Sequence, residues 1–211
     1  MLLASQRLIV FLSVALAALS GQAANTTARL VLSHAAARPG ETVWAGLHLR
    51  MAPKWHTYWE NGGDSGAGTK INWTLPSGIT AGDILWPVPQ KLSSEGLITY
   101  VYHDQVVLLI PLSIAANAPT GTVDLKARAS WLECAELCVP GNAQLSARLS
   151  IGSESKASPD AALLEAWKKK LPQPKPASFA PHSAQRLNDR GRESTPAAES
   201  RRTPCSPPAR E

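Results

Sequence analysis

The sequence Trp131-Leu-Glu-Cys134-Ala-Glu-Leu-Cys138-Val-Pro140 contains two of the three cysteines found in 211 residues. In an extended strand these two cysteines would lie about 13 Å apart, at about 3.3 Å per residue. A disulfide requires Cα atoms roughly 4.4–6.8 Å apart. The pair can therefore bond only if residues 135–137 form a tight turn or a single helical turn.

A bridge that closes so short a ring stabilises a fold only weakly. For a five-residue loop the chain-entropy estimate gives about 2 kcal/mol, against about 3 kcal/mol for fifteen residues. A small, exposed ring of this kind is readily opened by another thiol. The spacing favours a redox-active pair over a stabilising clip, and both interpretations stay open on the spacing alone.

Short predicted strands, broken by turn residues, extend outward from the cysteine pair in both directions. They are residues 28–33, 41–50, 55–59, 69–75, 84–86, 97–102, 105–115, 122–131 and 143–151. Loops are expected at the glycine-rich residues 60–68 and the polar residues 90–96. The apolar run 106–110 predicts a central strand, with a bulge or an end at Pro111. Over residues 25–152 this pattern predicts an all-β fold, an Ig-like antiparallel β-sandwich.

The ends of the chain have a different character from this domain. Arg7 and the apolar run 8–19 predict a signal peptide over residues 1–23, so we expect an exported, soluble mature chain. Residues 153–176 are predicted as a linker with a helix at 160–171, capped by Asp160. Residues 177–211 are rich in Pro, Arg and Ser and are predicted to be disordered; Cys205 lies there.

Charge excludes one class of partner. Residues 25–152 carry nine Lys/Arg and nine Asp/Glu, whereas residues 153–211 carry eleven and seven. The net charge of +5 therefore belongs to the terminal segments. A nucleic-acid-binding domain would need a basic face of its own, so we predict no nucleic-acid partner.

A metal site is the first alternative use for the two cysteines. Structural zinc usually takes four nitrogen and sulfur ligands, and soft copper favours methionine and thiolate. The chain has no second cysteine pair, and its histidines before the tail are scattered singly at His34, His48, His56 and His103. We predict no metal and no cofactor, and we expect His56 and His103 to be packed or turn residues. A cysteine hydrolase would need a base beside the thiolate, which the sequence does not identify.

Five motifs in a fixed order resemble the N-terminal periplasmic domain of the DsbD family of thiol:disulfide interchange proteins, including its copper-sensitivity suppressor (ScsB-like) branch. They are Trp55-His-Thr-Tyr-Trp59, Gly62-Gly-Asp-Ser-Gly66, Ile84-Leu-Trp-Pro-Val-Pro89, Tyr100-Val-Tyr102 and the cysteine segment 131–140. The resemblance runs from about residue 28 to about residue 176. It implies an Ig-like sandwich with Cys134 and Cys138 as the active-site pair, and a periplasmic location.

The resemblance also implies a reaction and partners. The domain would act as a protein-disulfide reductase, passing electrons to periplasmic thioredoxin-fold proteins of the disulfide isomerase or cytochrome c maturation type. It would not be self-sufficient, because full-length relatives continue into a membrane-embedded electron conduit and a thioredoxin-like domain. We expect this conduit to be missing and the tail to reflect a truncated or aberrant reading frame. The alternative is a non-catalytic periplasmic binding module, related to copper tolerance, with a structural disulfide.

Two further features differ from the best-known members. Their cysteines are separated by five residues, whereas three separate Cys134 from Cys138, as in the ScsB-like branch. Their pair is shielded by a loop with an aromatic residue, and the matching residues 91–96 have none. The resemblance therefore does not carry this shield over to the chain.

The roles of the two cysteines depend on opposing effects. Glu133 and Glu136, expected in water, would disfavour a thiolate at Cys134 by like-charge repulsion. A helical turn over residues 135–138 would favour that thiolate, because Cys134 would lie at its N-terminal end. We predict that Cys138 bonds the partner and that Cys134 resolves the mixed disulfide.

Overall fold

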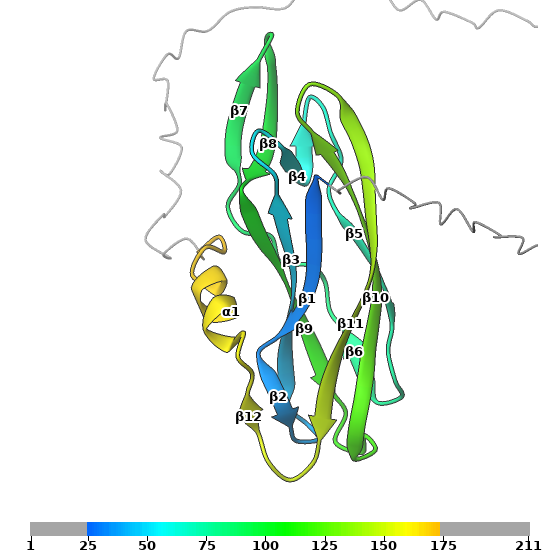
Figure 1. The fold of residues 1–211 in the computed structure, drawn as a ribbon. Helices are drawn as coiled ribbons and strands as arrows, with labels where there is room; N and C mark the ends of the chain where they lie inside the picture. Colours follow the sequence, from blue (N-terminus) through cyan, green and yellow to red (C-terminus); the bar gives the residue numbers. More distant parts are fainter. Residues whose placement is uncertain (1–24, 174–211) are drawn as a thin grey trace, which may run out of the picture. The chain divides into compact units, whose positions relative to one another are not determined.

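The computed structural model describes residues 25–173, which form two β-sheets packed face to face and a helix outside them (Figure 1). The first sheet has the order β1 (Thr26–Leu32), β3 (Thr42–Met51), β9 (Gln105–Ile114), β6 (Ile79–Ala81). The second has the order β12 (Lys156–Ala157), β2 (His34–Ala37), β11 (Cys138–Ile151), β10 (Gly121–Cys134), β4 (His56–Gly63), β8 (Leu97–His103), β7 (Gln90–Ser94), with β5 (Lys70–Thr74) paired to β10.

The predicted all-β sandwich is thus confirmed. Its strand pairs are antiparallel except for a short parallel pairing of β2 with β11. In the part of the chain that the structure describes, no helix is long and apolar enough to cross a membrane. The signal peptide expected over residues 1–23 and the disordered tail expected over 177–211, with Cys205, lie outside the described residues.

Strand β9 lies inside the first sheet, between β3 and β6, as its apolar run predicts. The prediction of a bulge or end at Pro111 was wrong, because β9 continues through Pro111 to Ile114. In a strand the N and O atoms of one residue point to the same side. The Pro111 carbonyl accepts a hydrogen bond from the Gly82 N–H just beyond the end of β6. Its missing N–H therefore costs no hydrogen bond with β3.

The polar segment expected as a loop at residues 90–96 is instead the edge strand β7 and a tight turn into β8. Glu95 and Gly96 both have positive φ, 51° and 82°, as two-residue hairpin turns require. The prediction was wrong because β7 is mostly exposed and lacks an apolar face. Residues 84–86, expected as a strand, contribute only an isolated bridge from Leu85 to Leu109.

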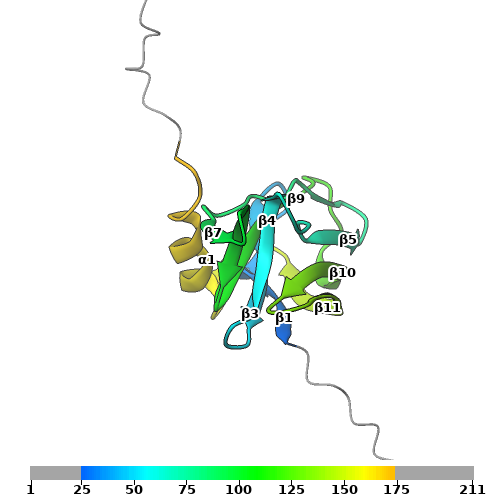
Figure 2. The same ribbon diagram turned by 90° about the horizontal axis from the view of Figure 1, so that it is seen from above.

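Helix α1 (Ala161–Lys168) is shorter than the predicted 160–171, and it covers the outer face of the first sheet. Its Leu164 and Trp167 are buried. Gly46 of β3 makes this close approach possible, since a Cβ there would lie 3.0 Å from the Leu164 side chain and 2.6 Å from that of Val107. Viewed from above, α1 lies on the opposite side of the sandwich from β10 and β11 (Figure 2).

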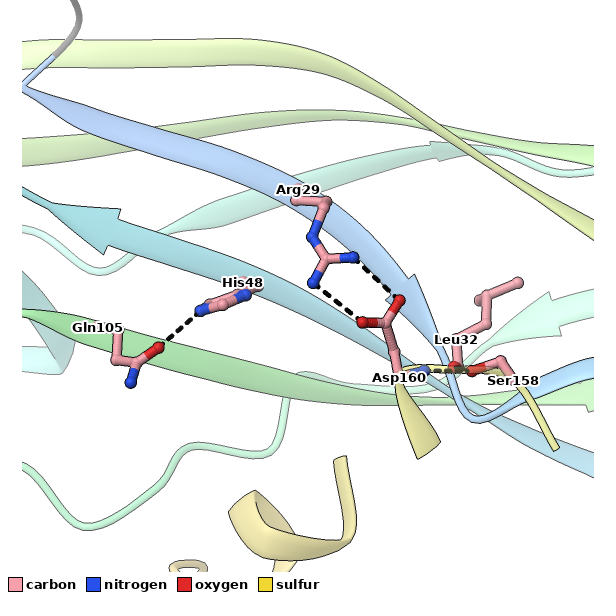
Figure 3. A network of polar contacts seen from close by, with 6 residues as sticks. All are labelled: Arg29, Leu32, His48, Gln105, Ser158 and Asp160. Carbon is pink, nitrogen blue, oxygen red and sulfur yellow. Dashed lines mark hydrogen bonds and ion pairs between the residues drawn. The ribbon is translucent and has the colours of Figure 1, made fainter. Parts of the chain in front are cut away.

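Polar contacts attach the segment before α1 to strand β1 (Figure 3). Arg29 donates two hydrogen bonds to the Asp160 carboxylate, at 3.0 and 2.9 Å, and the Ser158 hydroxyl donates to the Leu32 carbonyl. Asp160 occupies the N-cap position, as predicted, but its side chain makes no capping hydrogen bond. Its carboxylate is used for the ion pair with Arg29 instead.

Candidate functional site

The two cysteines face each other at the tip of the longest hairpin. Strands β10 and β11 pair residue for residue from Gly121–Ile151 up to Cys134–Cys138, and residues 135–137 form the loop between them. A disulfide joins the two cysteines, whose Cα atoms are 4.2 Å apart. Of the two geometries that the spacing allows, the chain uses the tight turn.

The two cysteines differ in their access to solvent. Cys134 is 7% exposed, whereas Cys138 belongs to the exposed residues of the tip. In thiol–disulfide exchange the incoming sulfur must approach one sulfur of the bond along an open path. An incoming sulfur can therefore reach the Cys138 side of the bond, whereas the Cys134 side is covered by protein.

Tyr58 of β4 contacts the exposed cysteine. Its hydroxyl donates a hydrogen bond to the Cys138 Sγ at 3.3 Å, since a disulfide sulfur has no proton to give. Burial raises the pKa of Tyr58, and a hydrogen bond with Ser65 acts in the opposite direction. The ring lies against Gly66, where φ is +93° and any Cβ would overlap the ring. The glycine-rich segment therefore fixes Tyr58 beside the disulfide.

Four side chains form a row across the second sheet. Cys138 pairs with Cys134, Cys134 with His56, and His56 with His103. Directly paired residues project from the same face of an antiparallel sheet. The ring centroids of His56 and His103 are 5.5 Å apart. Burial, and secondly repulsion from His103, lower the pKa of His56.

Glu133 lies on the other face of the sheet and is buried, so the expectation that it lies in water was wrong. Strand alternation turns its side chain inward, where its carboxylate accepts hydrogen bonds from the Trp131 Nε1 (3.0 Å) and the Asn25 Nδ2 (3.1 Å). The helical turn whose dipole would favour a Cys134 thiolate is absent from the tip. Glu136 is exposed, as expected.

Residues 91–96, which the sequence resemblance matches to the shielding loop of the best-known members, contribute an aliphatic side chain to the site. Leu92 packs against the small cluster formed by Tyr58, Val101 and Cys134. The aromatic group that contacts the disulfide is thus Tyr58, which comes from a different strand.

A shallow cavity of about 570 Å³ adjoins the hairpin tip. It is lined by Pro53, Lys54, Trp55, Ala135, Glu136, Leu137 and Val139. Leu137, between the cysteines, is 76% exposed. The tip therefore offers an apolar surface next to an accessible disulfide.

Among residues 25–173, no three His, Cys, Asp or Glu side chains gather closely enough to hold a metal ion.

The N-terminal domain of the thiol:disulfide interchange protein DsbD is the family whose pattern matches this chain, over residues 27–150. This match covers more than half of the sequence. The chain belongs to the DsbD N-terminal domain family. This family is involved in thiol:disulfide interchange, and the match includes both Cys134 and Cys138.

One solved structure supports this fold, and a second is reported for its similarity in sequence. The N-terminal periplasmic domain of ScsB from Proteus mirabilis is 22% identical, with a TM-score of 0.55 over 74% of this chain. The match spans only 57% of that structure's chain. The DsbD N-terminal domain from Neisseria meningitidis, in the reduced form, is 15% identical, with a TM-score of 0.28 over 61% of this chain and 89% of that one. No curated protein matches the sequence.

Sequence reasoning identified the cysteine pair of this DsbD-type domain but missed the side chains around it. His56 and His103 were expected as packed or turn residues, and His56 is buried while His103 ends β8 at the turn into β9. Their place beside the cysteines was not predicted, and neither was that of Tyr58. The available signal is the spacing of His56 and Tyr58, which places both on one face of a strand. Their position opposite Cys134 depends on the pairing of β4 with β10, which the sequence does not specify.

Replacing Tyr58 with Phe should make the reduced Cys138 less reactive. The variant keeps the ring against Gly66 but loses the hydroxyl, and a hydrogen bond to a thiolate favours the charged form. In a background with both Cys134→Ser and Cys205→Ser, we expect alkylation of Cys138 by iodoacetamide at pH 7 to slow about tenfold. Tyr100→Phe is the matched control, because its ring contacts Trp59. Equal rates in both variants would contradict a role for the hydroxyl.

Proposed function

We propose that this chain is a periplasmic thiol–disulfide exchange domain that relays electrons through Cys134 and Cys138 to thioredoxin-fold proteins. The observation that carries the proposal is the disulfide at the hairpin tip, with one exposed and one buried cysteine. The family match and the predicted signal peptide support the compartment. Partners of the disulfide isomerase or cytochrome c maturation type fit this role.

The proposed reaction has two steps. In the reduced domain, the Cys138 thiolate attacks the partner's disulfide, forms a mixed disulfide and releases one partner thiolate. Cys134 then loses its proton and attacks the Cys138 Sγ, which releases the second partner thiolate and closes the Cys134–Cys138 bond. Two electrons pass to the partner. A membrane-embedded electron conduit and a thioredoxin-like domain would reduce the pair again.

The apolar cavity beside the tip supports docking of a partner there. Its lining includes Trp55, and the exposed Leu137 lies next to Cys138. Burying an exposed leucine side chain contributes about 1.5–3 kcal/mol. A partner that covers this surface would bring its own disulfide to the accessible sulfur.

The reduction potential of the pair tests the proposal against the alternative of a binding module with a structural clip. We expect a value within the roughly −270 to −120 mV span of known exchange proteins, because the ring is small and Cys138 is accessible. A structural clip should lie below about −300 mV. The measurement is equilibration with glutathione redox buffers, using a Cys205→Ser variant so that only the pair responds. A value below about −300 mV would favour the binding module with a structural disulfide.

A further inference from the structure

The buried cysteine of the pair has a histidine directly opposite it. Cys134 and His56 are register partners on β10 and β4, and the Cβ atoms of such partners lie about 4.5–5.5 Å apart. This distance lets an imidazole nitrogen reach the neighbouring sulfur. His56 is 8% exposed. Its ring centroid lies 5.3 Å from that of Tyr58 and 5.5 Å from that of His103.

The second step of exchange has a chemical requirement that the disulfide alone does not meet. Cys134 must lose its proton before it can attack Cys138, because the thiolate is the nucleophile. Cys134 is buried among Tyr58, Val101, Leu92 and Leu132, and burial in apolar surroundings disfavours the charged thiolate. A base within reach would remove this barrier.

His56 is suited to accept this proton. Burial and the nearby His103 lower the pKa of His56, so the imidazole is neutral at pH 7. The titratable groups on its face are His103 on β8, Tyr58 on its own strand, Cys134 on β10 and Cys138 on β11. The β7 residues on this face, Gln90 and Leu92, are not titratable.

We propose that His56 is the general base that deprotonates Cys134 when the mixed disulfide is resolved; this rests on the exchange function proposed above. The Cys134 proton passes to an imidazole nitrogen of His56. The Cys134 sulfur bonds to the Cys138 Sγ as the bond from Cys138 to the partner sulfur breaks, and the partner leaves as a thiolate. The imidazolium then returns its proton to that thiolate or to water, so His56 is unchanged at the end.

Reaction of the reduced protein with 5,5′-dithiobis(2-nitrobenzoate) separates the two steps, in a Cys205→Ser background. Attack by Cys138 releases the first nitrothiobenzoate, and resolution by Cys134 releases the second. In His56→Gln we expect the first phase to be unchanged and the second to slow about 100-fold at pH 7, the lower end for loss of a general base. His103→Gln, one strand further along the row, should change the second phase less than about threefold.

The pH profile distinguishes a base from a merely structural residue. In the unmodified pair, the rate of the second phase should be independent of pH above about pH 7. It should fall only at a pH below the ordinary histidine pKa of about 6.5, as His56 becomes protonated, because burial lowers the pKa of His56. In His56→Gln, and in His56→Asn as a second replacement, the rate of the second phase should instead rise steadily from pH 6 to 9. An unchanged second phase with an unchanged profile would overturn the role of His56. If the starting protein releases no second nitrothiobenzoate, the exchange function itself fails.

Discussion

With Cys205 replaced by Ser, a Cys134→Ser variant should accumulate a mixed disulfide with a thioredoxin-fold protein, and a Cys138→Ser variant should not. Cys138 is exposed and receives a hydrogen bond from Tyr58, whereas Cys134 is buried at the base of the tip. An attacking thiol must be accessible and partly ionised. We expect Cys138 in the first variant to react more than about tenfold faster than Cys134 in the second.

The probe for this experiment is a thioredoxin-fold protein with a single active-site cysteine, carried as a mixed disulfide with nitrothiobenzoate. Attack on the probe releases nitrothiobenzoate and leaves a bond that the variant cannot resolve, so the product is visible by non-reducing electrophoresis. The unmodified pair should instead release the probe as a free thiol. The reverse pattern would give the attacking role to Cys134. Failure of all three proteins to react would argue against exchange altogether.

The cysteine tip was predictable because its constraints are local. The short spacing allows only a turn between Cys134 and Cys138 if they bond, and the flanking alternation on both sides indicates a hairpin. The sandwich followed from the same period-2 pattern, repeated in most strands. The central position of β9 was predictable because residues 106–110 are apolar on both faces, one toward the second sheet and the other toward α1.

The side chains around the tip were not predictable, because they depend on pairings between distant segments. Cys134 lies opposite His56 only because β10 pairs with β4, and the two residues are 78 positions apart in the sequence. A shift of that register by one residue would turn His56 to the opposite face. The burial of Glu133 depends likewise on a distant residue, since Asn25 supplies one of its hydrogen bonds. Strand β7 was missed for a different reason, since an exposed edge strand needs no apolar pattern.

Replacing Trp167 with Ala should cost the domain about 3–5 kcal/mol of unfolding free energy, the usual range for a buried tryptophan. The helix would otherwise be expected to contribute little, because eight residues form a marginal helix in isolation. Trp167 is 7% exposed and belongs to the same buried cluster as Leu47, Val107 and Leu109. Its loss would open a cavity above the outer face of β9. The Lys170 Nζ, 3.6 Å from the Trp167 ring centroid, would also lose its cation–π partner.

Urea unfolding of the oxidised protein measures this effect as a lower transition midpoint at an unchanged slope. Lys169→Ala is the matched control on the same segment, because Lys169 is exposed and should change stability by less than about 0.5 kcal/mol. A loss below about 1 kcal/mol for Trp167→Ala would mean that the sandwich is stable without the helix. A loss in the expected range would show that the folded unit extends through α1, since the outer face of β9 then depends on Trp167 for its burial.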